Sequence, residues 1–467
     1  VFTAENDWLL NQVLRSDWGF DGIVMSDWFG SHSTEPTISA GLNLEMPGPP
    51  RDRGKKLLNV IENGLVSQDE ITRLTRDMLL LLQRVGVLQQ SEERVEQAQD
   101  RPEHRKLIRK AGAEACVLLK NSGVLPVVTE TQAQKEAKPK IVVIGPNAKK
   151  AQIMGGGSAQ LNPHYAVSPY QGLSAQLDED LLDYTEGCNN HRYEPTLSGE
   201  FTAEYFASTD FSGDVVYAET INEVQRFIIG DVAEGRVDSR QFTLRISGSY
   251  LAARRLPYRI GAFAAGYIRV YVDDVLVVDA WGEKWQQGNT FFTDGCDEVI
   301  GVVPMTAGQS YKLIIEFACQ PDKKLVFGGY HVGIGKPALD EDIQLAVDKA
   351  RHADIAVLCV GRNDQWDTEG SDLPHIRLPG RQNELIAAVA SVNRNTVVVL
   401  QTGGPVEMPW VDQVNAILQA WYPGQEAGNS IADVILGQQE PSGRLPQTFP
   451  KRIEDAPTWS SDEEIYP

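Results

Sequence analysis

Continuous apolar runs recur along the second half of the chain and near residue 140. The runs at 141–145, 355–361, 396–400 and 416–418 are typical of strands that are buried on both faces of a sheet. Segments with helical spacing, such as 380–392, separate them. This alternation predicts a doubly wound αβα sandwich.

A period of two replaces this pattern between about residues 197 and 337. Segments 267–272 and 275–278 flank Asp273-Asp274 and predict a β-hairpin, and 311–317 alternates apolar and polar residues. The change predicts an all-β module inserted into the α/β domain. Because insertions of this kind sit at surface loops, the two flanking α/β parts are expected to rejoin in space.

The first 88 residues have the pattern of about two β/α units. A helix is predicted at 6–18, a buried strand at Ile23–Met25 and a second strand-like segment at 42–46. A capping box at 67–70 opens a long amphipathic helix. Since a closed barrel needs eight such units, we expect the C-terminal part of a (β/α) barrel, in a fragment that starts late in it.

Composition narrows the class of partner. The 467 residues carry a net charge of −21, with 42% hydrophobic and 23% charged residues, which is an ordinary globular composition. The negative charge argues against a nucleic acid or an anionic membrane and favours a neutral partner such as a carbohydrate. The sequence has no apolar stretch long enough to span a bilayer.

Cysteine usage and glycosylation motifs bear on the compartment. The five cysteines are odd in number and lack C-x-x-C spacing, so neither a zinc site nor a disulfide framework is predicted. The sequence also has no Asn-x-Ser/Thr acceptor. Both features favour an intracellular protein, and a secreted one stays open.

Asp27 is the first candidate for a reactive group. It follows the apolar run Ile23–Met25, and in β/α barrels the chemistry lies at the C-terminal ends of strands. The structural alternative is that Asp27 caps a helix or shapes a turn. Trp28 favours the catalytic interpretation, because an aromatic ring beside a carboxylate can pack against the apolar face of a sugar.

Retaining glycoside hydrolysis needs a second carboxyl group as acid and base, and Glu369 is the candidate. It lies in a loop, 365–374, that follows the run at 355–361, and Gly370 beside it permits unusual backbone geometry. A solvated acidic loop is the structural alternative. A glycine-rich loop at 154–159 could bring its backbone close to a ligand, but it lacks both nucleotide-binding patterns.

Other reaction classes lose ground on motif grounds. The sequence contains neither H-E-x-x-H nor G-x-S-x-G, and its seven histidines are scattered. Metal and serine-hydrolase chemistry are therefore disfavoured. His32 lies near Asp27 in the sequence and is interpreted as structural.

Four segments together resemble the glycoside hydrolase family 3 β-glucosidases. They occur in the family's order: GFDGIVMSDW at 19–28, GLNLEMP at 41–47, VLLKNSGVLP at 117–126 and IGPNA at 144–148. GGGSA at 155–159 and WYPGQE at 421–426 are also similar to family segments, and the inserted module resembles a PA14 domain.

The resemblance implies an α/β multidomain fold, with the following limits. Residues 1–88 would form the C-terminal part of the barrel, and 89–196 with 338–455 the αβα sandwich. The PA14-like module would span 197–337, and 456–467 would be a linker towards a fibronectin III-like domain.

For function, the resemblance implies a retaining β-glucosidase that releases terminal β-D-glucosyl residues, in glucan and cello-oligosaccharide catabolism. Asp27 matches the nucleophile, Glu369 the acid/base and Trp28 the sugar-packing aromatic residue, and Ser158 falls in a family segment that we assign to substrate binding. Asp27 and Glu369 lie far apart in the sequence, so the site would be an interdomain cleft. No metal or organic cofactor is implied.

The implied partners are β-glucosides and short gluco-oligosaccharides, and a homo-oligomer is an option. A β-xylosidase of the same family is the nearest alternative, and a non-catalytic carbohydrate-binding protein is the alternative from another class. The family's Arg and Lys-His sugar-binding elements are absent from the sequence, so the fragment by itself is predicted to be inactive.

Overall fold

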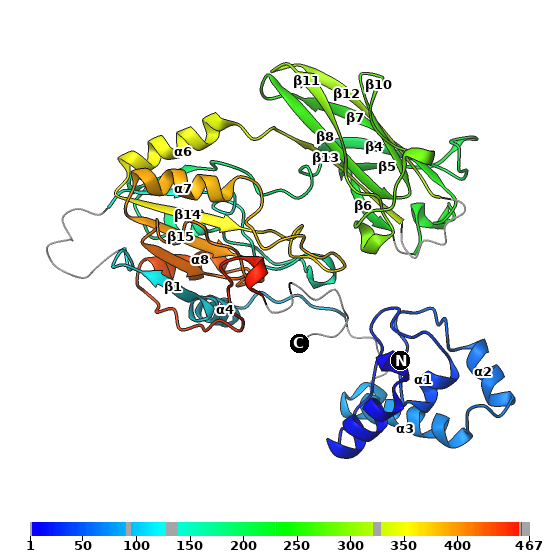
Figure 1. Ribbon diagram of the computed structural model, residues 1–467. Helices are drawn as coiled ribbons and strands as arrows, with labels where there is room; N and C mark the ends of the chain where they lie inside the picture. The colour runs from blue at the N-terminus through cyan, green and yellow to red at the C-terminus, as the bar shows by residue number, and fades with distance from the viewer. Residues whose placement is uncertain are drawn as a thin grey trace. The chain divides into compact units, whose positions relative to one another are not determined.

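The computed structural model describes residues 2–89, 95–127, 139–228, 230–320, 328–456 and 459. They form two compact units, Val1–Gln99 and Asp100–Pro467 (Figure 1). Most of the linker predicted at 456–467 lies outside the described residues, as do residues 90–94 and 128–138 of the segment assigned to the first part of the sandwich.

Unit 1 is helical. Its elements are η1 (Thr3–Glu5), the π-type helix η2 (Trp8–Asp17), α1 (Glu35–Ser39), α2 (Lys55–Glu62), α3 (Gln68–Arg84) and η3 (Val87–Gln89). The predicted capping box is confirmed: the Glu70 backbone N–H donates to Ser67 Oγ at 3.2 Å, and the Ser67 N–H donates to Glu70 Oε2 at 2.8 Å. Ile38, Val66 and Leu74 form the small buried core.

The prediction of a buried strand at Ile23–Met25 is wrong. Met25 makes a single parallel bridge to Leu44 and is 56% exposed. A buried parallel strand needs neighbours along both edges and covers on both faces. Among the described residues one segment hydrogen bonds to this run: the Asn43 N–H donates to Val24 O, and the Ser26 N–H donates to Leu44 O, each at 2.9 Å.

Unit 2 contains a six-stranded sheet in the order β1-β16-β15-β14-β2-β3. Its strands are β1 (Val117–Asn121), β2 (Ile141–Ile144), β3 (Leu182–Thr185), β14 (Ile355–Gly361), β15 (Thr396–Gln401) and β16 (Ala416–Gln419). β16, β15, β14, β2 and β3 are parallel, whereas β1 pairs antiparallel with β16 at the edge. Every residue of β2, β14, β15 and β16 is buried, as their apolar runs predict.

Helices cover both faces of this sheet (Figure 1). They are α4 (Pro102–Ala115), α5 (Pro169–Ser174), α6 (Asp340–His352), α7 (Gln382–Val392) and α8 (Ala427–Ile435). One core cluster joins the sheet to α4, α5 and α8, and another joins it to α6 and α7. The doubly wound arrangement is thus confirmed, with an antiparallel edge strand added.

The segment between β3 and α6 folds into two antiparallel sheets. One has the order β10-β9-β12-β7-β4-β5 and the other β11-β8-β13-β6. The strands are β4 (Ser198–Phe206), β5 (Val215–Glu223), β6 (Gln225–Ile228), β7 (Thr243–Leu251), β8 (Leu256–Ala265), β9 (Tyr267–Val272), β10 (Val275–Ala280), β11 (Val299–Met305), β12 (Ser310–Ala318) and β13 (Gly328–Gly335). We call residues 197–337 the β module; it has a hydrophobic core of its own.

The predicted hairpin is confirmed as β9–β10. Its two turn residues, Asp273 and Asp274, have positive φ angles of 47° and 65°. Positive φ at both central residues defines a type I′ turn, whose twist matches that of the strands it joins. The Asp-Asp pair is therefore the local reason for this reversal.

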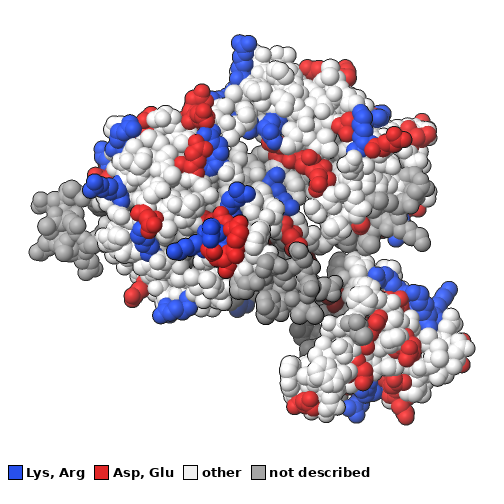
Figure 2. Space-filling model, in the orientation of Figure 1, with Lys and Arg blue, Asp and Glu red and all other residues white. Residues whose placement is uncertain are grey.

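Charge is mixed over the surface. Figure 2 shows Asp and Glu interspersed with Lys and Arg on the visible face of both units. None of the described helices combines the length with the apolar character needed to cross a membrane.

Candidate active site

Asp27 lies in an exposed turn of unit 1. Its Oδ1 accepts a hydrogen bond from the Trp28 backbone N–H at 2.6 Å. The turn is held by buried Ser26, whose Oγ accepts from the Met46 N–H at 2.9 Å, and by the Phe29 N–H, which donates to Met46 O at 3.1 Å. Asp27 thus shapes its turn and still presents its carboxylate to solvent.

The rings around Asp27 differ in their surroundings. Trp28 is 54% exposed, so much of its ring surface is free to contact an apolar face of a ligand. The Phe29 ring meets Trp28 edge-on, with centroids 6.4 Å apart, and Arg51 lies over Phe29 at 4.8 Å. His32 stacks on Phe2 with a centroid distance of 3.9 Å, which is a packing contact.

Glu45 is a buried carboxylate that the sequence analysis missed. It accepts hydrogen bonds from the backbone N–H groups of Arg51 and Asp52, at 3.3 and 3.0 Å. It therefore fixes the loop after Met46. The only hint in the sequence is an acidic residue inside the apolar segment 42–46.

In unit 2, the parallel strands all end on the same side of the sheet. We call this side, where their C-terminal ends lie, the C-terminal edge. β2, β14, β15 and β16 are successive neighbours and run in the same direction, so the loops that follow them lie side by side. This edge is where doubly wound sheets bind ligands. It carries both the acidic loop with Glu369 and the glycine-rich loop with Ser158.

Two buried asparagines, Asn147 and Asn190, hydrogen bond to the backbone where β14 ends. Asn147 is fully buried; its Nδ2 donates to Arg362 O at 3.3 Å, and its Oδ1 accepts from Asn190 Nδ2 at 2.9 Å. Asn190 Nδ2 also lies 3.1 Å from Gly361 O. The exit of β14 is therefore fixed by side chains from two other segments.

The glycine-rich loop packs directly on the acidic loop. The Gly156 N–H donates to Asp367 O at 2.9 Å, and the Ser158 N–H donates to Glu369 Oε2 at 2.8 Å. A Cβ atom on Gly156 would lie 2.0 Å from Asp364 O, so no larger residue fits there. The backbone of the glycine-rich loop therefore lies close to the loop that carries Glu369, whereas its predicted approach to a ligand stays a prediction.

Ser158 also shifts the pKa of Glu369. Hydrogen bonds from its hydroxyl and backbone N–H lower the pKa of Glu369, which is exposed. Donors that favour the carboxylate act against a proton-donating role and favour a basic one. A general acid needs the opposite direction, a raised pKa, because it must hold its proton until the leaving oxygen takes it.

Asp367 is a further carboxylate at this edge that sequence analysis did not single out. Its Oδ1 accepts from Arg362 Nη1 at 3.0 Å, and its Oδ2 accepts from the Gly403 N–H at 2.7 Å and Tyr422 OH at 2.6 Å. Arg362 is 1% exposed. Burial, followed by the charge of Asp367, raises the pKa of Tyr422, so the phenol stays a donor.

The segment that leads into the β module also hydrogen bonds to the acidic loop, through Arg192. Arg192 Nη2 donates to Ser371 Oγ at 2.7 Å, its Nη1 donates to Gln365 O at 3.2 Å, and its guanidinium lies 5.5 Å from the Trp366 ring centre. In addition, Trp366 Nε1 donates to Asn190 O at 2.8 Å. The loop is thus tied to both the sheet edge and the base of the module.

The module itself also reaches this loop. A Cβ atom placed on Gly370 would lie 2.5 Å from Phe292 Cδ1, so the ring packs against the residue next to Glu369. Phe291, Phe292 and Thr293 all have positive φ angles, of 49°, 56° and 70°. Bulky residues in this region indicate a backbone held in place by its surroundings.

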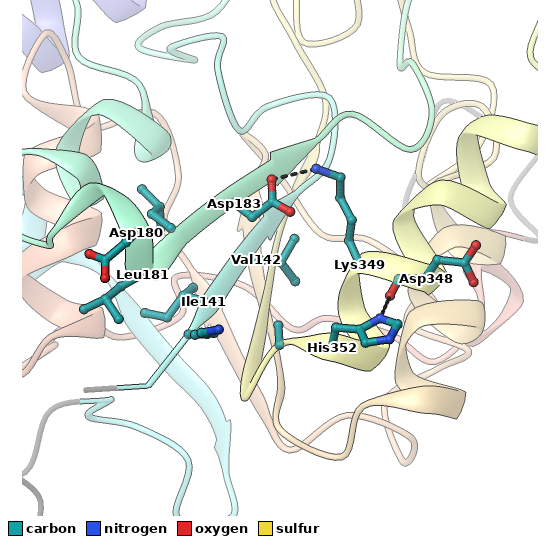
Figure 3. A pocket seen from close by; sticks show the side chains of 11 residues that line it. Ile141, Val142, Asp180, Leu181, Asp183, Asp348, Lys349 and His352 are labelled. Carbon is teal, nitrogen blue, oxygen red and sulfur yellow. Dashed lines mark hydrogen bonds and ion pairs between the residues drawn. The ribbon is translucent and has the colours of Figure 1, made fainter. Parts of the chain in front are cut away.

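A separate hollow of about 550 Å³ lies at the opposite end of the sheet, beside the start of β2 and the end of α6 (Figure 3). Its charged groups bond locally: Lys349 Nζ pairs with Asp183 Oδ1 at 2.6 Å, and His352 Nδ1 lies 2.7 Å from Asp348 O. None of the predicted site residues lines it. We therefore assign the candidate site to the strand ends.

The described residues offer no group of three or more His, Cys, Asp or Glu side chains arranged to hold a metal ion. All five cysteines are buried free thiols, and burial raises the pKa of Cys116, Cys188 and Cys359 to about 12. Such thiols are unreactive. The carboxylates of Asp27 and Glu369, in contrast, are exposed in their loops.

Asp27 in an exposed turn of unit 1, Glu369 in an exposed strand-end loop of unit 2 and the open ring of Trp28 are the kinds of groups that glycoside hydrolases use. Residues 3–80 match the glycosyl hydrolase family 3 N-terminal domain, and residues 116–467 match the glycosyl hydrolase family 3 C-terminal domain. The chain belongs to glycoside hydrolase family 3.

Two curated relatives cover almost the whole chain. A "Beta-glucosidase" of Rhizobium radiobacter is 47% identical over 473 residues, covering 100% of this chain and 56% of the relative. A "Probable beta-glucosidase I" of Aspergillus terreus is 36% identical over 478 residues, covering 98% of this chain and 56% of the relative. The chain thus spans a little over half the length of these relatives.

Solved structures share the fold. The beta-glucosidase of Kluyveromyces marxianus, crystallised in complex with glucose, superposes with a TM-score of 0.84 at 31% identity, covering 98% of this chain and 57% of that one. A beta-glucosidase of Streptomyces venezuelae gives a TM-score of 0.63 at 28% identity, covering 96% and 53%. The mixed α/β, multi-sheet architecture is therefore that of family 3 β-glucosidases.

Proposed function

We propose that this chain is part of a β-glucosidase that releases terminal β-D-glucosyl residues with retention of configuration. The observation that carries the proposal is the 47% identity to the Rhizobium radiobacter "Beta-glucosidase" along the whole chain. The proposed substrates are β-glucosides and short gluco-oligosaccharides from glucan and cellulose breakdown.

Asp27 is the proposed nucleophile. Its carboxylate attacks the anomeric carbon, the glycosidic bond breaks, and a covalent glucosyl ester forms. Glu369 gives its proton to the departing oxygen, then takes a proton from the water that cleaves the ester and frees Asp27. Trp28 packs against the sugar, and Ser158 orients Glu369 and contributes to substrate binding. The exposure of both carboxylates supports these roles.

The proposal sets two requirements on the complete protein. Retention requires the two carboxyl groups to be about 5–5.5 Å apart on either side of the scissile bond. Glu369 must also hold a proton in the first step, against the effect of Ser158. A second carboxylate nearby and the exclusion of water by a bound sugar both raise the pKa of a carboxyl group, and either supplies what the first step needs.

The β module is proposed to be PA14-like and to cover the aglycone side, limiting substrate length. The packing of Phe292 on Gly370 supports this, since it brings a module loop to the residue beside Glu369. We further propose that 1–88 belong to a (β/α) barrel and that 89–196 and 338–455 form the sandwich around the module at 197–337.

The experiment that tests the reaction uses the full-length protein and a 2-deoxy-2-fluoro-β-glucosyl inhibitor, which traps the covalent intermediate of a retaining enzyme. Peptide mass spectrometry should find the adduct on the peptide with Asp27, and an Asp27→Asn variant should give none.

Aryl β-glucoside and β-xyloside hydrolysis are compared in the same preparation. Faster xyloside hydrolysis would point to a β-xylosidase. Sugar binding without any adduct or turnover would point to a non-catalytic carbohydrate-binding protein.

A further inference from the structure

Asp367 connects three strand-end loops through one carboxylate. It sits in the loop after β14 and pairs with Arg362 at the start of that loop. Its Oδ2 takes the Gly403 N–H, just after β15, and the Tyr422 hydroxyl, just after β16. Its side chain is 13% exposed, so these hydrogen bonds are largely shielded from water.

The chemistry of this cluster requires a carboxylate. All three partners are donors, and one of them is a guanidinium buried to 1% exposure. An asparagine would turn its NH₂ group towards a donor in either orientation and would leave Arg362 without its counter-charge. The Arg362 guanidinium also donates from Nη2 to Pro405 O, at 2.7 Å.

The backbone of Asp367 also contacts the glycine-rich loop to which Glu369 is hydrogen bonded. Asp367 O accepts the Gly156 N–H at 2.9 Å, and two residues on, Glu369 Oε2 accepts the Ser158 N–H at 2.8 Å. These two hydrogen bonds align the acidic loop with the glycine-rich loop. The side chain of Asp367 in turn joins the acidic loop to the loops after β15 and β16.

We propose that Asp367 is a positioning residue for the acid/base, holding Glu369 through the Arg362–Gly403–Tyr422 cluster; this rests on the proposed role of Glu369. Asp367 itself does not touch the reacting atoms. Its loss displaces Glu369 and so slows the steps in which a proton is transferred.

The test measures hydrolysis by full-length Asp367→Asn on aryl β-glucosides whose leaving groups range from 2,4-dinitrophenol to phenol. A good leaving group departs without a proton, so displacement of the acid shows only with poor ones. We expect a loss of kcat/KM of about tenfold or more on the phenyl glucoside and about twofold or less on the dinitrophenyl glucoside, a part of the 10²–10⁴-fold that general acid catalysis supplies.

Azide gives a second readout, because it attacks the glucosyl ester without a base. Added azide should raise the turnover of Asp367→Asn on the dinitrophenyl glucoside and yield β-glucosyl azide. Tyr422→Phe, which removes one donor of the cluster, should show the same leaving-group dependence and azide rescue more weakly. If Asp367→Asn does not fold, Tyr422→Phe tests the positioning role in its place.

Asp433→Asn is the matched control. Asp433 pairs with Arg109 between α8 and α4, at 2.5 and 2.6 Å, and its side chain is 11% exposed, close to the 13% of Asp367. Breaking this pair should lower the melting temperature. Any change in kcat/KM should be the same for good and poor leaving groups.

The Glu369→Ala variant tests the acid/base assignment of Glu369 separately from the positioning role of Asp367. If it shows leaving-group dependence and azide rescue while Asp367→Asn loses activity equally on all substrates, or not at all, the positioning role is overturned alone. If Glu369→Ala shows neither signature, its acid/base assignment falls and the role of Asp367 falls with it.

Discussion

At the scale of the residue, the two proposed catalytic carboxylates have different surroundings. Asp27 is held by the N–H of its own neighbour, in a turn fastened to Met46. Glu369 is held by Ser158 from a loop that precedes it by more than two hundred positions, and this contact lowers its pKa. The proton affinity of the acid/base is therefore adjusted by one serine.

Ser158→Ala should move the pH profile upwards. Removing the hydroxyl takes away a donor that favours the carboxylate, so the pKa of Glu369 rises, although the backbone N–H still donates. Glu369 then keeps its proton to higher pH, and the alkaline limb of kcat/KM against pH should shift to higher pH. Ser174→Ala, on the exposed end of α5, is the control; an unmoved or lowered limb would contradict the assignment.

At the scale of the element, the site of unit 2 is made by loops that different strands hold together. The glycine-rich loop follows β2, the acidic loop follows β14, and Gly403 and Tyr422 follow β15 and β16. Their contacts are close enough that a single methyl group would disturb them. The segment before the β module clamps the same loop with Arg192.

Gly156→Ala should destabilise the site by overpacking. Its φ of −90° suits alanine, so the effect comes from the added Cβ, 2.0 Å from Asp364 O and 2.7 Å from Thr368 Oγ1. We expect a loss of about 1–3 kcal/mol in the free energy of unfolding, measured by denaturant titration, together with lower activity.

Gly404→Ala is the comparison at the same edge, where a Cβ would meet its nearest atoms at 3.6 and 4.0 Å. It should be tolerated. Equal stability losses in the two variants would show that the tight contact at Gly156 does not matter.

Arg192→Ala should loosen the acidic loop without unfolding the sheet. It removes two side-chain hydrogen bonds and the contact with Trp366, each hydrogen bond being worth about 0.5–1.5 kcal/mol. Amide hydrogen exchange should speed up several-fold at 363–372 and stay unchanged in β15. Arg351→Ala, which breaks an exposed pair with Asp348, should change neither.

At the scale of the whole molecule, unit 2 consists of parts with separate cores. The β module has one hydrophobic cluster, and the sheet has another on each face. β2 precedes the module and β14 follows it, yet the two pair in parallel at the centre of the sheet. The inserted module therefore interrupts the sequence of the sandwich without interrupting its sheet.

The β module should fold by itself. Residues 197–337, expressed alone, contain both antiparallel sheets and their shared core. We expect a cooperative thermal transition by circular dichroism and dispersed amide signals by NMR. Ile315→Ala, at a fully buried core position, should lower the melting temperature; a non-cooperative transition in the parent would show that the module depends on the sandwich.

The sequence alone was enough to predict the central strands of unit 2, one hairpin of its β module and the family. Apolar runs identify strands when both faces of the sheet are covered, and so β2, β14, β15 and β16 were predictable, as was the β9–β10 hairpin from period two and its Asp-Asp turn. The same rule failed at Ile23–Met25, where an apolar run lacks the neighbours that would make it a strand. A local sequence pattern indicates which residues are suited to a strand, but not which other strands lie beside it.

How the loops contact one another could be read from the folded structure alone. The antiparallel pairing of β1, the packing of Gly156 against the acidic loop and the convergence of Arg362, Gly403 and Tyr422 on Asp367 join segments far apart in the sequence. No spacing rule predicts such contacts, because they depend on the order of strands in the sheet. The direction of the Glu369 pKa is likewise a property of its folded surroundings: the chemistry called for a proton donor, and Ser158 favours the carboxylate.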